Sequence, residues 1–121
     1  MEKRILIAED SGFLRRACGR FLSFNNYSVT ACASAAEAAD KIRTDKFHIL
    51  ITDFDLGDGY GNDLIALIKG ENPAAKALLI TGDEKLAGTR GPGPVYADAE
   101  ALIKPFKMER LLTQLSDIEN D

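Results

Sequence analysis

Short apolar runs alternate with amphipathic segments along the whole chain. The apolar runs predict five β-strands, at about residues 4–8, 28–32, 47–53, 77–81 and 101–103. The run at 47–53 is apolar at nearly every position, which is typical of a central strand buried on both faces. Strands that alternate with helical patterns indicate βαβ units, so the chain is predicted to have an α/β fold with a parallel sheet.

The first segment between these runs has the pattern of an amphipathic helix. Ser11 is placed to cap it, and Asn25 and Asn26 are expected to end it. Its apolar face has the spacing i, i+3, i+4, i+7 and i+8, with Leu14, Ala17, Cys18, Phe21 and Leu22. Arg15, Arg16 and Arg20 fall on the other side, where we expect a solvated face or a contact with acidic groups of a partner.

Three more helices are predicted from similar signals. Ser34 and Glu37 have the spacing of a capping box, for a helix that continues to about residue 43. A helix at about 62–69 is stopped before Pro73. The last helix presents one apolar face, formed by Met108, Leu111, Leu112 and Leu115.

The stretch from 82 to 97 departs from this regular pattern. Residues 83–87 have the composition of one or two helical turns, but the run that follows, Gly88 to Pro94, contains three glycines and two prolines. Glycine and proline disfavour a helix interior by about 1 and 3 kcal/mol respectively. We therefore expect a short, broken or mobile connection here, which carries any state-dependent output.

Chemically active residues follow four of the five predicted strands. Glu9 and Asp10 follow the first, Asp53 ends the third, Thr81 ends the fourth and Lys104 follows the fifth. Ligands of open α/β sheets bind at the carboxyl ends of the strands, so these side chains are expected to converge. Close carboxylates repel one another unless a cation or protons intervene. A hard divalent ion such as Mg²⁺ is the natural partner.

Each of these residue types suits phosphoryl chemistry. The Asp53 carboxylate is able to attack a phosphoryl group and form an aspartyl phosphate. Lys104 supplies a compact positive charge for phosphoryl oxygen, and Thr81 supplies a hydroxyl. The alternative for each residue is structural: a turn-capping aspartate, solvated acids at a helix entry, a plain ion-pair lysine and an ordinary strand threonine.

Composition restricts the broad class. A chain of 121 residues is predicted to be one domain, 1–121. A net charge of −4 argues against nucleic acid as the main partner. No apolar stretch approaches the roughly 20 residues of a membrane span, and the start resembles a strand and not a signal sequence, so we expect a cytoplasmic protein. Cys18 and Cys32 are then expected to be small, reduced core residues, and His48 is expected to be structural or on the surface.

The chain resembles the receiver domains of bacterial two-component response regulators, including chemotaxis receivers. The resemblance runs from Arg4 to the last helix. It is carried by five motifs in order, namely Glu9-Asp10, Asp53, Gly61, Thr81-Gly82 and Lys104-Pro105-Phe106. Each motif is weak alone, but all five follow the expected strands.

The resemblance implies a fold and a set of roles. The fold is a flavodoxin-like, doubly wound sheet of five parallel strands in the order 2-1-3-4-5, with helices on both faces and a short or disrupted fourth helix. Asp53 matches the phosphoacceptor, and Lys104, joined to Pro105 by a cis bond, matches the lysine that contacts phosphate. Thr81 matches the switch hydroxyl.

The implied metal site uses the same edge. Asp10 and Asp53 match direct ligands of Mg²⁺ (or Mn²⁺), with the backbone carbonyl of Asp55 as a third ligand. Glu9 matches an acid that reaches the metal through water.

The implied function is a signalling switch that catalyses only its own phosphorylation and dephosphorylation. A sensor histidine kinase or histidine phosphotransfer protein would donate the phosphoryl group, and an unidentified downstream protein would read the state. The sequence is compatible with a stand-alone protein and with a piece of a longer regulator or hybrid kinase.

One departure leaves two other functions open. Ala101 stands where the family usually has an aromatic residue that reports the movement of the switch hydroxyl. A degenerate receiver that acts as a phosphorylation-independent interaction module is therefore one alternative. The other is an aspartate-nucleophile phosphatase of the haloacid dehalogenase type, which Asp53-Phe54-Asp55 resembles, although the order of the acidic motifs argues against it.

Overall fold

The computed structural model describes residues 3–82 and 99–120. Five parallel strands form one sheet in the order β2-β1-β3-β4-β5. The strands are β1 (Arg4–Ala8), β2 (Ser28–Cys32), β3 (Ile49–Asp53), β4 (Lys76–Thr81) and β5 (Glu100–Ile103). This order confirms the predicted fold. The expectations for residues 82–97 fall, apart from Gly82, outside the described residues.

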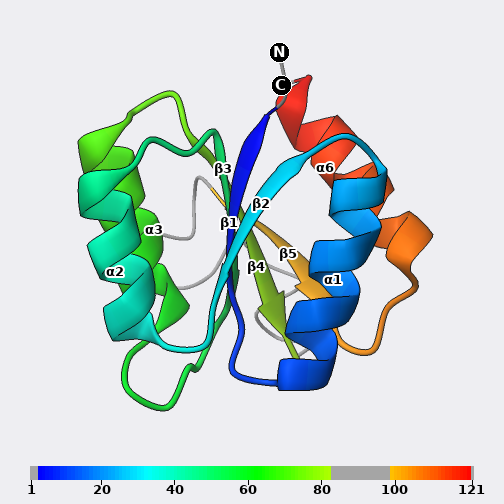
Figure 1. The fold of residues 1–121 in the computed structure, drawn as a ribbon, viewed down its shortest axis with the longest axis horizontal. Helices are drawn as coiled ribbons and strands as arrows, with labels where there is room; N and C mark the ends of the chain where they lie inside the picture. Colours follow the sequence, from blue (N-terminus) through cyan, green and yellow to red (C-terminus); the bar gives the residue numbers. More distant parts are fainter. Residues whose placement is uncertain (1–2, 83–98, 121) are drawn as a thin grey trace.

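Helices cover both faces of the sheet (Figure 1). The helices α2 (Ala35–Thr44) and α3 (Gly61–Glu71) lie on one face, and α1 (Gly12–Phe24) and α6 (Met108–Glu119) lie on the other. β1 begins and α6 ends at the amino edge of the sheet, opposite the edge where the strands end. In the described part of the chain, no helix has the length and apolar character needed to cross a bilayer.

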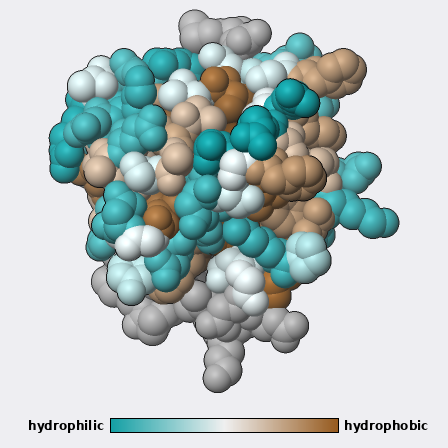
Figure 2. All heavy atoms as spheres, turned by 60° about the horizontal axis from the view of Figure 1, so that its bottom comes forward, coloured by the Kyte–Doolittle hydropathy of each residue, from teal (hydrophilic) through white to brown (hydrophobic). Residues whose placement is uncertain are grey.

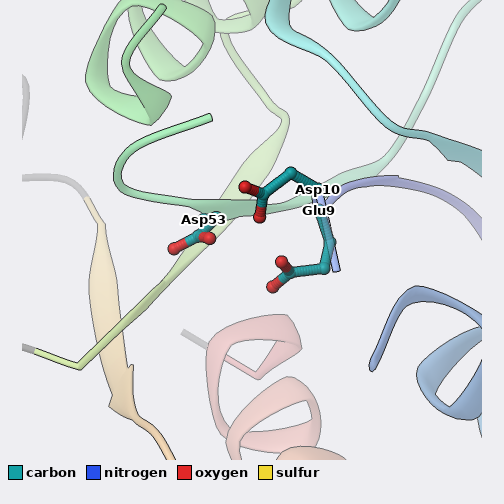
Figure 3. A group of neighbouring side chains, drawn as sticks. All are labelled: Glu9, Asp10 and Asp53. Carbon is teal, nitrogen blue, oxygen red and sulfur yellow. The ribbon is translucent and has the colours of Figure 1, made fainter. Parts of the chain in front are cut away.

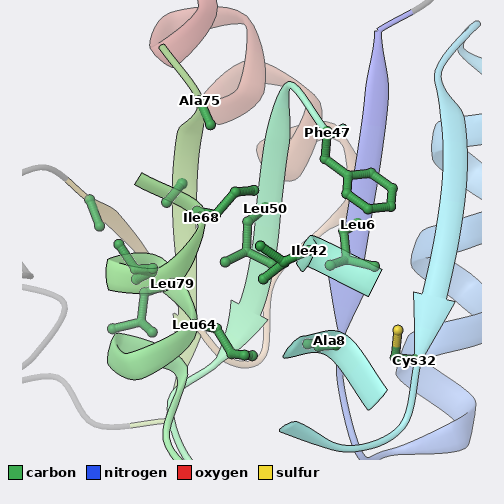
Figure 4. Close-up of a cluster of buried hydrophobic side chains, with 14 of the residues drawn as sticks. Leu6, Ala8, Cys32, Ile42, Phe47, Leu50, Leu64, Ile68, Ala75 and Leu79 are labelled. Carbon is green, nitrogen blue, oxygen red and sulfur yellow. The ribbon is translucent and has the colours of Figure 1, made fainter. Parts of the chain in front are cut away.

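The alternation of side chains explains why the central strands carry apolar residues on both faces. In β1, Leu6 and Ala8 belong to the core under α2 and α3 (Figure 4), whereas Ile5 and Ile7 belong to the core under α1 and α6. The other central strands, β3 and β4, divide their side chains in the same way. A strand covered on both faces needs apolar residues of both parities, which is the pattern in the sequence.

The two cysteines lie in different cores. Cys18 packs in the core under α1 and α6, and Cys32 packs in the core under α2 and α3, each with 1 % of its surface exposed. Both are free thiols, and the sheet lies between them. Burial raises the pKa of each thiol to about 11. The expectation of two small core residues is confirmed.

Some predicted boundaries and contacts were wrong in detail. β3 begins at Ile49 and not at Phe47, which instead packs in the core with the Arg4 guanidinium 4.9 Å from its ring centroid. α3 begins one residue earlier than predicted and ends two residues later, at Glu71. In α6, Leu112 is only half-buried, because it lies beside the buried face formed by Leu111, Leu115 and Ile118.

The helix caps follow the predictions closely. Ser11 Oγ accepts the Leu14 N–H, and Ser34 Oγ accepts the Glu37 N–H. Glu37 Oε1 reaches back to the N–H of Ala33, one residue before the position that a standard capping box uses. Asn26 takes a left-handed φ of 71° just after α1, as suits the end of a helix.

Candidate functional site

Strand register places Glu9 and Asp53 side by side. Ala8 of β1 pairs with Thr52 of β3, so the next residues of the two strands lie level at the carboxyl edge. Ile7 and Ile51, two residues earlier, both face the α1 and α6 side. Since side chains alternate along a strand, Glu9 and Asp53 face that side as well. Local sequence therefore selects the acids, and the register brings them together.

Asp10 completes an acidic cluster at this edge (Figure 3). One carboxylate oxygen from each of Glu9, Asp10 and Asp53 lies within 4.8 Å of the others, and the three groups point toward a common space. Glu9 is 1 % exposed and Asp53 is 9 % exposed, whereas Asp10 is exposed. The cluster is buried at one side and open at the other, and hydrophilic surface is prominent on this side of the molecule (Figure 2).

Lys104 brings a positively charged ammonium group to the acidic cluster. Its Nζ lies 2.9 Å from Glu9 Oε1, as an ion pair whose angles fall outside hydrogen-bond geometry, and 3.2 Å from Asp53 Oδ2. Burial lowers the pKa of Lys104, but the two carboxylates outweigh burial and the net shift is upward. Lys104 is therefore charged at neutral pH. Its peptide bond to Pro105 is cis.

Glu9 is the acid with the most perturbed surroundings. Burial raises its pKa, and the neighbouring Asp10 and Asp53 act in the same direction. The Ser11 N–H, which donates to Glu9 Oε2 at 3.0 Å, and Lys104 lower the pKa again without cancelling the rise. Three carboxylates thus face one ammonium group in the described residues. A divalent cation fits this donor set, because it would offset the remaining negative charge with hard oxygen ligands.

Asp53 is held by its backbone neighbours. Its Oδ1 accepts the N–H of Phe54 at 2.9 Å, while Oδ2 faces Lys104. Gly61, at the start of α3, passes so close that a Cβ on it would collide with the Asp53 carbonyl and press on the Thr52 side chain. Glycine at 61 is therefore required by close backbone approach.

The loop between β3 and α3 forms a small hairpin next to Asp53. The N–H of Gly61 donates to the Phe54 carbonyl at 2.7 Å, and the N–H of Leu56 donates to the Gly59 carbonyl at 2.9 Å. These two bonds flank the bridge between Asp55 and Tyr60, so neither uses the Asp55 carbonyl. Gly57 sits in the turn with a φ of 87°, which favours glycine.

Thr81 ends β4 and is 3 % exposed. Its carbonyl accepts the Lys104 N–H at 2.8 Å, which links the end of β4 to the residue that carries the site's ammonium group. Ala101 lies on β5, half-buried against the core under α2 and α3. The small methyl group of Ala101 therefore stands at the position where the sequence analysis noted the absence of an aromatic ring.

The structure corrects the interpretation of Arg15. Its Nη1 donates to the Glu9 carbonyl at 2.9 Å and more weakly to the Asp10 carbonyl at 3.4 Å. Arg15 is half-buried and supports the acid pair, whereas Arg16 and Arg20 are exposed as predicted. The sequence did offer one sign of this contact: Arg15 lies in the first turn of α1, close in the chain to Glu9 and Asp10. His48 is structural, as expected, because its Nδ1 accepts the Arg4 N–H at 2.9 Å.

Comparison with known proteins agrees with this geometry. Residues 5–116 match the family model described as the response regulator receiver domain. The chain belongs to the response regulator receiver domain family. Receiver domains are signalling switches of two-component systems and not enzymes in the usual sense. The resemblance seen in the sequence is confirmed.

Two named response regulators are similar to this receiver domain in sequence. It is 30 % identical over 113 residues to the response regulator receiver protein CpdR of Brucella abortus, covering 93 % of each chain. It is also 30 % identical to the response regulator MprA of Mycobacterium tuberculosis, but it spans only 50 % of that protein's length.

Solved structures show the same fold. A response regulator receiver protein from Sinorhizobium medicae has a TM-score of 0.86 at 24 % identity, covering 98 % of this chain and 95 % of that one. The chemotaxis response regulator CheY4 of Vibrio cholerae has a TM-score of 0.85 at 23 % identity, covering 98 % of this chain and 99 % of that one.

Proposed function

We propose that this receiver domain is a phosphoacceptor switch in which Asp53 takes a phosphoryl group in the presence of Mg²⁺. The observation that carries the proposal is the placement of Asp53 between Lys104 and an acidic pair, with its carboxylate only 3.2 Å from the lysine ammonium. A structural aspartate at a strand end does not need three further charged groups around it.

The residues around Asp53 have separate roles in this proposal. Asp10 and Asp53 would hold the metal directly, with the Asp55 carbonyl, and Glu9 would act through water. When bound, the metal supplies positive charge next to the transferring group. Lys104 supplies the second positive charge, and Arg15 holds the backbone of the acid pair in place.

The transfer step balances with a phosphohistidine as donor. A carboxylate oxygen of Asp53 forms a bond to phosphorus while the bond from phosphorus to the donor nitrogen breaks. The electron pair of that bond stays on the imidazole, whose other ring nitrogen carries a proton, so the donor leaves as a neutral histidine side chain. Water later attacks phosphorus while the bond from phosphorus to the Asp53 oxygen breaks. The electron pair of that bond returns to the Asp53 carboxylate, inorganic phosphate leaves, and a proton of the water passes to the phosphate or to solvent. Lys104 faces Asp53 throughout, and Thr81 would follow the phosphoryl oxygen.

The proposed setting is cytoplasmic, with residues 1–121 acting as one receiver unit. A sensor histidine kinase or a histidine phosphotransfer protein would be the donor, and a downstream protein would bind differently to the two states. The named relatives, CpdR and MprA, are response regulators, which supports a donor of this class.

The test is phosphoryl uptake from acetyl phosphate with Mg²⁺, measured by intact mass. The wild type should gain one phosphoryl group, and Asp53→Asn should gain none. Asp10→Asn should bind Mg²⁺ more weakly and lose uptake. Lys41→Gln, on the exposed face of α2, should behave like the wild type.

The competing function is an interaction module that no longer takes phosphate. The half-buried Ala101 on β5 is the observation that favours it. No mass change in the wild type at saturating Mg²⁺ and acetyl phosphate would support that module and exclude the switch. Continued labelling of Asp53→Asn at Asp55 or Asp58 would contradict the assignment of Asp53 as the sole acceptor. Repeated turnover of an added phosphate ester would instead indicate the phosphatase alternative.

A further inference from the structure

Asp58 links the loop beside Asp53 to a helix that lies elsewhere in the sequence. Its Oδ1 accepts the N–H of Ala35 at 2.8 Å, and its Oδ2 accepts the N–H of Ala36 at 3.0 Å. These are the first two residues of α2. Both carboxylate oxygens of one side chain are therefore used on one helix terminus, and the two backbone hydrogen bonds lower the pKa of Asp58.

α2 also has a local cap, formed by Ser34 and Glu37 and separate from Asp58. Ser34 Oγ accepts the Glu37 N–H, and Glu37 Oε1 accepts the Ala33 N–H. The first N–H groups of a helix lack partners within the helix. In α2 these groups are divided between the local cap and Asp58. The contacts of Asp58 therefore add a connection between two segments, in addition to ending a helix.

The loop is also fitted closely to α2 beside this contact. A Cβ on Gly59 would lie 2.9 Å from the Cβ of Ala35, so the loop backbone packs directly against the helix. Asp58 stands in the tight turn that the Leu56 N–H and the Gly59 carbonyl close. Asp55 lies immediately before this turn, in the bridge with Tyr60. Because the turn is short, a restraint on Asp58 also restrains Asp55.

We propose that Asp58 is a positioning residue, which holds the hairpin of residues 54–60 against α2 and so fixes the Asp55 carbonyl for the metal. This inference rests on the proposed function of the site. The hairpin contains Gly57 and Gly59, whose backbones lose more freedom on ordering than those of other residues. A tether to a rigid helix reduces the freedom that must be lost when the metal binds.

The structure provides a matched control for this proposal. Ser34→Ala removes a cap from the same terminus of α2 but leaves the contact with the loop in place. Asp58→Ala removes the contact with the loop but leaves the local cap. Asp58→Asn keeps one acceptor oxygen and should lie between the wild type and Asp58→Ala. The three variants separate an effect on helix stability from an effect on the loop.

Mg²⁺ titration is the first readout. Asp58→Ala should weaken Mg²⁺ binding roughly tenfold, the lower end of what outer partners of metal ligands contribute. Uptake from acetyl phosphate should be slower at low Mg²⁺ and should recover when Mg²⁺ is raised to saturation. Ser34→Ala should lower the thermal midpoint and leave Mg²⁺ affinity and uptake unchanged. Equal weakening by Asp58→Ala and Ser34→Ala, or no weakening by Asp58→Ala, would overturn the proposal.

Amide hydrogen exchange, measured without metal, separates this proposal from the proposed function. Asp58→Ala should speed exchange at the Leu56 and Gly61 N–H groups, which close the hairpin, and Ser34→Ala should not. Unchanged exchange there in Asp58→Ala would overturn the tether even if the protein takes phosphate. If Asp58→Ala exchanges faster there while the wild type binds no Mg²⁺ and takes no phosphate, the tether is supported and only its link to the metal is rejected.

Discussion

The two edges of the sheet differ in how they handle charge. At the carboxyl edge, Glu9 and Asp53 are buried and share one lysine. At the amino edge, a hollow of about 230 Å³ is lined by His48, by one acid, Glu119, and by three lysines, Lys3, Lys46 and Lys76. Within residues 3–82 and 99–120, no carboxylate oxygen lies within 4.0 Å of the Nζ atoms of these three lysines.

Helix direction explains part of this difference. The helices begin at the carboxyl edge, where their free N–H groups favour negative charge, as at α2 with Asp58. They end at the amino edge, where their free carbonyl groups favour positive charge, and α2 carries Lys41 and Arg43 in its last turn. Exposure explains the rest. Lys3 and Lys46 are exposed and Lys76 is half-buried, so water screens these charges from one another. Glu9 and Asp53 are buried, so their charges need a nearby cation.

The largest difference between the edges should appear along α3, which runs from one to the other. Gly61→Ala should lower the free energy of unfolding by about 3 kcal/mol, because its methyl group collides with the Asp53 carbonyl. Gly70→Ala, near the other end of α3, has open space and should raise the free energy of unfolding by roughly 0.8 kcal/mol. Urea titration of both variants measures the contrast. Similar effects of the two changes would mean that the backbone can move to make room for a methyl group at Gly61.

Lysines at the two edges should also differ. Lys104→Gln leaves Glu9 and Asp53 without their ammonium partner and should lower the free energy of unfolding by about 2 kcal/mol without metal, below the range for fully buried pairs because Lys104 is partly exposed. Lys76→Gln should change it by less than about 0.5 kcal/mol. Mg²⁺ should restore more stability to Lys104→Gln than to Lys76→Gln. Equal losses of unfolding free energy in the two variants without metal would show that Glu9 and Asp53 do not depend on Lys104 for their stability.

Two neighbouring arginines on α1 provide a smaller test within the carboxyl edge. Arg15→Gln removes the guanidinium that donates to the Glu9 carbonyl, so phosphoryl uptake should fall by roughly tenfold, equivalent to about 1.4 kcal/mol for a hydrogen bond from a charged group. Arg16→Gln, which is exposed, should leave the rate unchanged. The rate of mass gain with acetyl phosphate measures both. A loss in both variants would indicate that the arginines act through charge and not through the bond to Glu9.

The smallest effect concerns His48 at the amino edge. Burial and then Lys3, Lys46 and Arg4 lower its pKa from the ordinary value of 6.5. Because the folded protein then binds this proton less tightly than the unfolded chain, the His48 contribution to stability is present above pH 6.5 and is lost as the pH falls through the lowered pKa. NMR titration of the imidazole should show the lowered pKa.

A charge variant identifies the cause of the His48 shift. Lys46→Gln should move the pKa of His48 upward, and added salt should do the same by screening the lysines. Lys41→Gln should leave the pKa of His48 in place. If the pKa of His48 does not change in Lys46→Gln, Lys46 is excluded as a cause of the lowered pKa.

Much of the fold could be predicted from the chain because both cores impose a clear pattern. Ile5 to Ala8 must be apolar at both parities, and Ser11 and Ser34 cap helices with local bonds. The limits of β3 and the half-exposed Leu112 could not be predicted as well, since both depend on which neighbours cover the ends of an element. A local pattern carries little information about these neighbours.

The sequence by itself determined the acids, the lysine and the strands whose ends they occupy. Only the tertiary structure decided that Glu9 lies level with Asp53, that Arg15 supports the acid pair, and that Asp58 reaches the first residues of α2. Register and helix packing set these contacts, and the contact of Asp58 joins residues 22 and 23 positions apart. A side chain in a loop has no periodicity that shows its distant partner, so such a contact becomes visible only when the chain is folded.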